Sequence, residues 1–323
     1  MGEITSNPYI NREDQDDIED IAASIFSRHG IDFAILQRAG GWTNAVWMTD
    51  ELVLRLSTKK ENENLLREAR LSAFLPPEVG YPQLVETGIT VGYAWALARR
   101  LPGGSLGAAW DELHSEERAT ALQGLWARAQ AVHSVPCEEI AAIVPGRAWF
   151  NSTDPEEAET SLTRLTKERI LTKTEAVALH ETLTRFWRIL PAAPCVLCHG
   201  DLTADNAVWH NGQVTALLDF EFAVMAPVQL DLNHLVKCAF GPDDAGEDGQ
   251  LRQVVRELAM PILAQPNGST LLAGYAILLE LWLLELWLAH PEGEGPLEQW
   301  SPLRRLRLLA DGRGGYLAPL ILN

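Results

Sequence analysis

Along the first part of the chain, hydrophobic residues recur with the period of a helix in some segments and with the period of a strand in others. In residues 11–29 the apolar side chains repeat every three or four positions, which predicts an amphipathic helix. "GGWTNAVWMTD" and "ELVLRLS" predict two strands. The pair Gly40-Gly41 precedes the first strand, and a tight turn at Asp50-Glu51 joins the two. A second helical stretch, "KENENLLREARLSAFL", precedes the strand "YAWALAR" and a turn-forming segment at residues 101–104. We therefore expect helix, hairpin, helix and strand in this order.

The rest of the chain has mainly helical patterns, with one exception. Capping-box residues mark helix starts at Asp154-Pro155 and at Thr172. Between the helical stretches lies "AVWHNGQVTALLDF", in which Asn211-Gly212 separates two apolar runs. An Asn-Gly pair in this position is the strongest short-range signal of a β-hairpin.

One segment, residues 271–289, is apolar enough for a membrane span. It carries Glu280 and Glu285 in its middle, and an acidic residue at the centre of a span costs about 3 kcal/mol to insert. A buried core helix is therefore the favoured interpretation. The two acids are expected to be paired inside the protein rather than to bind a substrate.

Charge and composition narrow the classes of partner. The 323 residues include 26 Lys plus Arg and 44 Asp plus Glu, a net charge of −18, which disfavours nucleic acid and anionic membranes as partners. The charge either attracts a cationic ligand or only keeps the protein in solution. Four cysteines do not make a disulfide framework in a chain of this length. The first residues are acidic and lack the apolar region of a signal peptide, so we expect a cytoplasmic protein.

The segment "PCVLCHGDLTADN", residues 194–206, fits two different chemistries. Cys195, Cys198 and His199 have the spacing of a c-type haem attachment site. This interpretation is disfavoured, because the chain shows no export signal and no suitable axial Met, and "CVLC" is also typical of an apolar strand. His199, Asp201 and Asn206 instead have the spacing of a kinase catalytic loop, in which both cysteines would be chemically idle.

Phosphoryl transfer needs a carboxylate to accept the proton of the attacking hydroxyl and oxygen ligands to hold Mg²⁺ on the phosphates. Asp201, Asn206 and Asp219 supply such a set: one loop carries the first two, and the hairpin returns the chain to the third. The chain contains no G-x-x-x-x-G-K-[ST] motif, which excludes a P-loop kinase.

At this point the chain resembles the aminoglycoside phosphotransferase and choline kinase-like family of small-molecule kinases. "HGDLTADNAVW" is similar to its catalytic loop, "LLDFEFAVMAPVQLDLNHL" to its metal segment, "GGWTNAVW" to its phosphate-covering turn and "VLRLS" to its third strand. The resemblance implies an α+β, protein-kinase-like bilobal fold. A small β-rich N-lobe, residues 1–101, would bind the nucleotide, and a larger, mainly helical C-lobe, residues 102–323, would carry the catalytic loop and the acceptor-binding helices.

The resemblance also implies roles for individual residues. Asp201 would be the catalytic base, and Asn206 and Asp219 the metal ligands. His199 and Asp231 would support the catalytic loop, and the hinge backbone near Arg99 and Leu101 would bind the adenine of ATP, or the base of GTP.

The chain departs from the family pattern at Arg55, where the third strand usually has Lys; we expect Glu68 to pair with Arg55. A second departure, "DFE" at 219–221 in place of D-F-G, argues against a protein substrate.

These features together predict an ATP- and Mg²⁺-dependent O-phosphotransferase for a small hydroxylated molecule, acting as a monomer or homodimer. Asp205 and Glu221 lie close in sequence to the expected metal ligands and would make the acceptor side negative, which favours a cationic acceptor such as an aminoglycoside antibiotic. Glu221 could instead only pair with a neighbouring basic residue. The alternatives are a metabolic kinase of the choline, fructosamine or homoserine type, and a pseudokinase that binds nucleotide without turnover.

Overall fold

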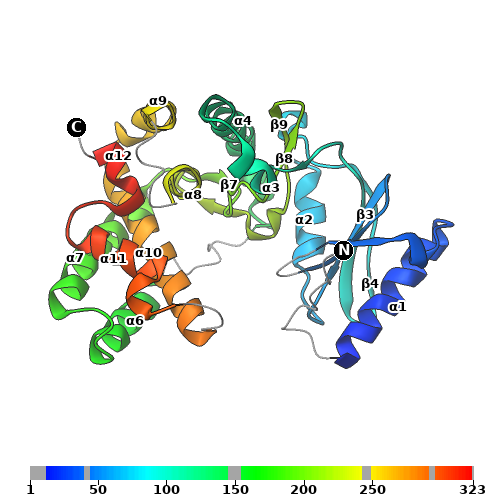
Figure 1. The fold of residues 1–323 in the computed structure, drawn as a ribbon, viewed down its shortest axis with the longest axis horizontal. Helices are drawn as coiled ribbons and strands as arrows, with labels where there is room; N and C mark the ends of the chain where they lie inside the picture. Colours follow the sequence, from blue (N-terminus) through cyan, green and yellow to red (C-terminus); the bar gives the residue numbers. More distant parts are fainter. Residues whose placement is uncertain (1–11, 40–43, 145–153, 242–248, 291–294, 322–323) are drawn as a thin grey trace.

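The computed structural model describes residues 12–39, 44–144, 154–241, 249–290 and 295–321. The pair Gly40-Gly41 and the first half of "GGWTNAVW" lie outside these ranges. Figure 1 shows a smaller N-lobe, which carries the sheet and α1, beside a larger helical C-lobe. The protein-kinase-like α+β architecture expected from the sequence is thus confirmed.

A five-stranded antiparallel sheet forms the N-lobe, in the order β1-β2-β3-β5-β4. Two helices accompany it. The elements are α1 (Arg12–Arg28), β1 (Gln37–Ala39), β2 (Asn44–Met48), β3 (Leu52–Ser57), α2 (Asn64–Ser72), β4 (Leu84–Thr90) and β5 (Tyr93–Arg99). All five strands precede residue 101, although the domain boundary itself remains a prediction.

The alternation of β3 decides which side chains reach the rest of the protein. Leu54 and Leu56 are fully buried in a cluster with the apolar face of α1, which includes Ile18 and Phe26. Since successive side chains of a strand point to opposite faces, Arg55 projects from the other face, toward α2 and the C-lobe. Arg55 therefore leaves the core side of the strand.

The second predicted helix of the N-lobe is shorter than its sequence pattern suggested. The pattern covered residues 60–75, but α2 begins only at Asn64. Glu61 has a positive φ of 61°, and the Asn62 side chain accepts a hydrogen bond from the Asn64 amide. Such a local side-chain bond competes with helical backbone hydrogen bonds, so the polar residues at 60–63 form a turn before the helix.

Helices dominate the C-lobe, with short strands around the expected catalytic loop. Its helices are α3 (Leu106–Ala109), α4 (Ser115–His133), α5 (Cys137–Ile140), α6 (Pro155–Lys167), α7 (Lys173–Ile189), α8 (Gln229–Phe240), α9 (Gly249–Leu263), α10 (Gly268–Ala289), α11 (Ser301–Ala310) and α12 (Ala318–Ile321). Its strands are β6 (Gly104–Ser105), β7 (Val196–Cys198), β8 (Ala207–His210), β9 (Gln213–Leu217) and β10 (Val224–Ala226). The Asn211-Gly212 turn joins β8 to β9, as expected.

Helix α10 is the one helix among the described residues that is long and apolar enough to cross a membrane, and 61% of its most apolar window is buried inside the protein. Its Glu280 is fully buried and lies 2.6 Å from Lys237 Nζ and 3.5 Å from an Arg305 nitrogen. Glu285 pairs with Arg164 of α6. Both acids are thus paired within the C-lobe, and α10 is the core helix that the sequence favoured.

Candidate active site

The catalytic-loop motif begins at the end of β7, where the backbone must turn sharply. Gly200 has a φ of 82°, and a Cβ atom there would lie 2.1 Å from the carbonyl oxygen of Phe222. Only glycine fits such a position without strain. The amides of His199 and Gly200 donate to the two carboxylate oxygens of Asp231, at 2.9 and 3.0 Å. Asp231 therefore holds the loop backbone from α8, as the family resemblance implied.

His199 supports the loop from the other side. Its Nε2 lies 2.8 Å from the carbonyl oxygen of Leu218, which directly precedes Asp219, and its Nδ1 accepts a hydrogen bond from the Asp201 amide at 3.3 Å. The imidazole also contacts the Phe220 ring, with 4.5 Å between centroids. His199 thus connects the segment of the expected base to the segment of the expected metal ligand.

Asp201 and Asn206 lie side by side. The Asn206 amide nitrogen donates to the backbone oxygen and to Oδ2 of Asp201, both at 2.9 Å. This orientation leaves the amide oxygen of Asn206 for a metal. The Asp201 carboxylate is 26% exposed, so a hydroxyl can reach it.

The β8–β9 hairpin returns the chain to the catalytic loop and so positions Asp219 near Asn206. The Leu218 amide donates to the Asn206 carbonyl oxygen at 2.8 Å, which closes the hairpin, and Asp219 then adopts a left-handed conformation with a φ of 63°. Its carboxylate is 31% exposed. Carboxylate and amide oxygens are the hard ligands that Mg²⁺ prefers, so Asp219 and Asn206 fit a magnesium ion.

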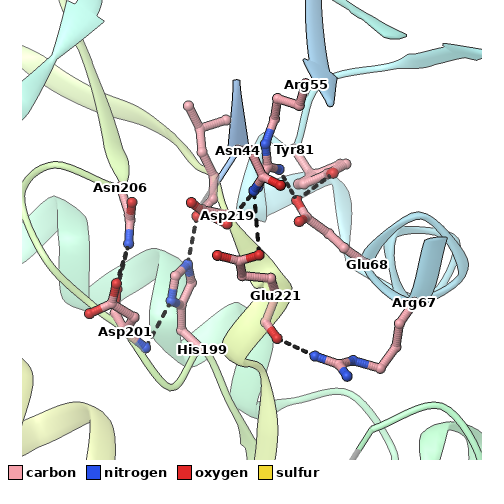
Figure 2. A network of polar contacts seen from close by, with 11 residues as sticks. Asn44, Arg55, Arg67, Glu68, Tyr81, His199, Asp201, Asn206, Asp219 and Glu221 are labelled. Atoms are coloured by element: carbon pink, nitrogen blue, oxygen red, sulfur yellow. Dashed lines mark hydrogen bonds and ion pairs between the residues drawn. The ribbon is translucent and has the colours of Figure 1, made fainter. Parts of the chain in front are cut away.

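Arg55 joins the N-lobe to this cluster. One of its terminal nitrogens donates to Glu68 Oε1 at 2.7 Å, and the other donates to Asp219 Oδ1 at 2.6 Å. Although burial acts to lower the pKa of the guanidinium, the charges of Glu68 and Asp219 hold that pKa above its ordinary value. Figure 2 shows Asp219 between the Asp201–Asn206 pair and the Arg55–Glu68 pair. The expected pairing of Arg55 with Glu68 is therefore confirmed.

The hinge segment offers only part of its backbone to a nucleotide base. The Arg99 amide already donates to the Gln83 carbonyl, and the Arg100 amide to the Glu51 carbonyl. The Arg99 side chain is exposed and lies 3.6 Å from Glu51. The Leu101 amide has no backbone partner among the described residues, so Leu101 remains the better candidate for contacting a base.

The two residues expected to face an acceptor differ in their positions. Asp205 is exposed within the catalytic loop, directly before Asn206. Glu221 is 2% exposed, accepts a hydrogen bond from the side-chain amide of Asn44 in β2 at 3.4 Å, and lies close to Asn44 and Asp219 (Figure 2). Its backbone oxygen accepts from Arg67 of α2. Burial between the lobes keeps the Glu221 carboxylate from an acceptor, so the prediction that it lines the acceptor side is wrong.

Sequence reasoning missed several residues that contact the site. Asn44 and Tyr81 of the N-lobe contact Glu221 and Glu68, and His133 of α4 lies 2.8 Å from Asp231. His234, one turn after Asp231 on α8, is buried with its Nδ1 3.9 Å from Asp201 Oδ1. The spacing of three residues from Asp231 placed His234 on the same helix face and was the one sequence signal that could have identified it.

His133, Cys198 and Asp231 lie close enough together to suggest a metal site, but their hydrogen bonds argue otherwise. The Asp231 carboxylate is held by His133 and two backbone amides, and burial raises the pKa of the Cys198 thiol, which donates to the Ala226 carbonyl. Burial also raises the pKa of Cys195. Protonated thiols are poor nucleophiles and metal ligands, in agreement with the expectation that both cysteines are chemically idle.

Comparison with known proteins gives a family match and a set of similar folds. The family model described as "phosphotransferase enzyme family" matches residues 34–261. No curated protein matches the sequence.

Among solved structures, the GDP complex of aminoglycoside 2'-phosphotransferase-IIIa has a TM-score of 0.65 at 18% identity, over 91% of this chain and 97% of the other. ADP-bound APH(2'')-Ib has a TM-score of 0.62 at 15% identity, over 90% and 98%. A thermostable mutant of APH(4)-Ia in complex with ADP and hygromycin B has a TM-score of 0.63 at 14% identity, over 93% and 98%. At these identities, the structural likeness shows the fold alone.

Proposed function

The chain belongs to the phosphotransferase enzyme family, and from this membership we propose that it is an ATP- or GTP-dependent, Mg²⁺-dependent small-molecule kinase that phosphorylates a hydroxyl group. The observation that carries the proposal is the convergence of Asp201, Asn206, Asp219 and Arg55. Phosphoryl transfer depends mainly on positioning and charge stabilisation, and this cluster contains one group for each task.

Each residue has a defined part in the reaction. Asp201, oriented by the Asn206 amide, accepts the proton of the attacking hydroxyl. Asp219 and Asn206 would hold Mg²⁺, which when bound would neutralise part of the phosphate charge. Arg55 binds the phosphates. To do so, the terminal nitrogen that donates to Asp219 in the structure must donate to a phosphate instead, while the other terminal nitrogen keeps its hydrogen bond to Glu68. The hinge backbone at Leu101 contacts the base.

For the acceptor we propose a cationic, hydroxylated molecule of the aminoglycoside type. Two observations support this: the similar folds include an enzyme in complex with hygromycin B, and the chain has a net charge of −18 with Asp205 exposed in the catalytic loop. The burial of Glu221 removes one of the carboxylates expected on the acceptor side. The second candidate is therefore a metabolic kinase of the choline, fructosamine or homoserine type, whose acceptor carries fewer positive charges than an aminoglycoside.

A substrate panel tests the proposal. Purified protein would be supplied with Mg²⁺ and either ATP or GTP, and nucleoside diphosphate release would be followed with aminoglycosides, choline, a fructosamine and homoserine as acceptors. We expect acceptor-dependent release with an aminoglycoside, abolished by removal of Mg²⁺ with a chelator. Release only with a metabolic alcohol would support the second candidate. Nucleotide binding without release for any acceptor would indicate a pseudokinase and contradict the proposal.

A further inference from the structure

Tyr81 shares with Arg55 the buried carboxylate that orients Arg55. Its hydroxyl donates to Glu68 Oε1 at 2.8 Å, and the same oxygen accepts from Arg55 at 2.7 Å (Figure 2). Burial, together with the neighbouring Glu68, keeps the pKa of Tyr81 well above its ordinary value, so the hydroxyl stays protonated and donates. The other oxygen of Glu68 is buried and has no hydrogen-bond partner among the described residues. Arg55 and Tyr81 are therefore the two groups that hold this carboxylate in place.

The segment that carries Tyr81 is attached to the C-lobe, although it lies between the N-lobe elements α2 and β4. Gly80 has a φ of 73°, and a Cβ atom there would lie 2.1 Å from the carbonyl oxygen of Thr215 in β9. Arg128 of α4 donates to the Val214 carbonyl at 2.8 and 2.9 Å and also to the Glu78 carbonyl. Tyr81 is thus fixed relative to the C-lobe, which also supplies Asp219.

The ring of Tyr81 makes a second connection. It packs edge-on against Phe220, with 5.7 Å between centroids and 74° between planes, and Phe220 in turn contacts the His199 ring. Phe220 directly follows Asp219. The hydroxyl of Tyr81 therefore acts on the Arg55–Glu68 pair of the N-lobe, while its ring contacts the segment that carries the metal ligand.

We propose that Tyr81 is a positioning residue for nucleotide binding: its hydroxyl holds Glu68 so that Arg55 is aligned with the phosphates above Asp219. This inference rests on the proposed function, because it needs Arg55 to bind a nucleotide. Without the hydroxyl, the Glu68 carboxylate loses one of the two hydrogen-bond partners that it has in the described part of the chain, and Arg55 loses the fixed anion that directs one of its terminal nitrogens. The ring contact with Phe220 does not depend on the hydroxyl.

Tyr81→Phe separates the two contacts, since it removes the hydroxyl and keeps the ring. Affinity is measured with Mg-ATP or Mg-GTP, whichever the wild-type protein binds more tightly. We expect the Kd of this nucleotide to rise about tenfold in Tyr81→Phe, the size expected for one hydrogen bond to a charged group. The KM of the acceptor should stay unchanged. Tyr316→Phe is the matched control. Its buried hydroxyl donates to Asn233 Oδ1 at 2.7 Å in the C-lobe, so its loss should lower stability without changing nucleotide affinity.

A double-mutant cycle shows whether Tyr81 acts through Glu68. In a Glu68→Ala background, Tyr81→Phe should change nucleotide affinity less than twofold, because the acceptor of its hydrogen bond is gone. Three outcomes would overturn the inference and leave the proposed function standing. They are a full tenfold effect of Tyr81→Phe in the Glu68→Ala background, an equal loss of nucleotide affinity in Tyr81→Phe and Tyr316→Phe, and an unchanged nucleotide affinity in Tyr81→Phe. Wild-type protein that binds neither nucleotide with Mg²⁺ would overturn both.

Discussion

At the scale of single residues, the two carboxylates of the site are held in different ways. Asp201 is oriented by a neutral amide five residues away, whereas Asp219 is paired with a cation 164 residues away. Asp219 also has a positive φ of 63°, and a non-glycine residue in this conformation costs about 1–3 kcal/mol and persists only where its surroundings enforce it. The hairpin closure at Leu218 and the bond to Arg55 provide that enforcement.

The role of Asp201 gives the first residue-scale prediction. Asp201→Asn keeps an oxygen that can accept from Asn206, so folding and nucleotide affinity should stay near those of the wild type. The side chain can no longer accept a proton, so kcat should fall at least about a hundredfold. Steady-state kinetics and nucleotide titration measure the two effects. Asp311→Asn, at an exposed carboxylate that pairs with Arg313, is the control. A kcat near the wild-type value in Asp201→Asn would refute the assignment of the base.

At the scale of elements, α8 joins the catalytic loop to α4. Asp231 accepts hydrogen bonds from the loop and from His133 of α4 at 2.8 Å. Burial by itself would raise the pKa of Asp231, but the His133 hydrogen bond and the neighbouring donors lower it below the ordinary value. A carboxylate with a depressed folded pKa adds stability above its unfolded pKa, about 3.9, and this stability is lost as pH falls through the folded pKa.

Removing His133 should therefore reduce stability in a pH-dependent way. We expect His133→Ala to lower the free energy of unfolding at pH 7 by about 1.5–3 kcal/mol, the range for a hydrogen bond to a charged group. The difference from the wild type should shrink as pH falls below about 3.9. Denaturant unfolding at pH 3.5, 5 and 7 measures this, with the exposed His180→Ala as control. A difference that stays constant with pH would show that His133 acts through packing alone.

At the scale of the whole molecule, the net charge of −18 acts over distances greater than any contact. Glu221 does not add negative charge to the acceptor side, because its side chain is buried against Asn44. The attraction of a cationic acceptor therefore depends on Asp205 and on the summed surface charge. Such long-range attraction is screened by salt, with a Debye length of about 8 Å at physiological ionic strength.

This origin of the attraction leads to a kinetic prediction. The kcat/KM for a cationic acceptor should fall by a few-fold, on the order expected for electrostatic steering, between low and physiological salt, whereas that of a neutral analogue should stay nearly constant. Asp205→Asn should raise the KM of the cationic acceptor alone. Equal use of the neutral analogue, with no salt effect, would instead point to a kinase of an uncharged sugar or alcohol.

The features determined by the sequence alone are those set by neighbouring residues. The turn at Asn211-Gly212 and the pairing of Asp201 with Asn206 in one loop depend on local backbone geometry, and both agree with the sequence patterns. The opposite directions of Leu54 and Arg55 likewise follow from the alternation of a single strand. The edge strand β4 was missed, because its apolar Val85 and Ile89 lie at exposed positions, whereas Gly88 and polar residues occupy partly buried ones.

Only the tertiary structure decided which distant groups meet. Glu221 is two residues from Asp219, and this proximity in sequence suggested an acceptor contact, but Asn44, 177 residues away, buries it between the lobes. The bonds of Tyr81 to Glu68 and of His133 to Asp231 likewise join separate elements. Side-chain periodicity shows which face of an element a residue occupies, but the partner on that face depends on how the elements pack.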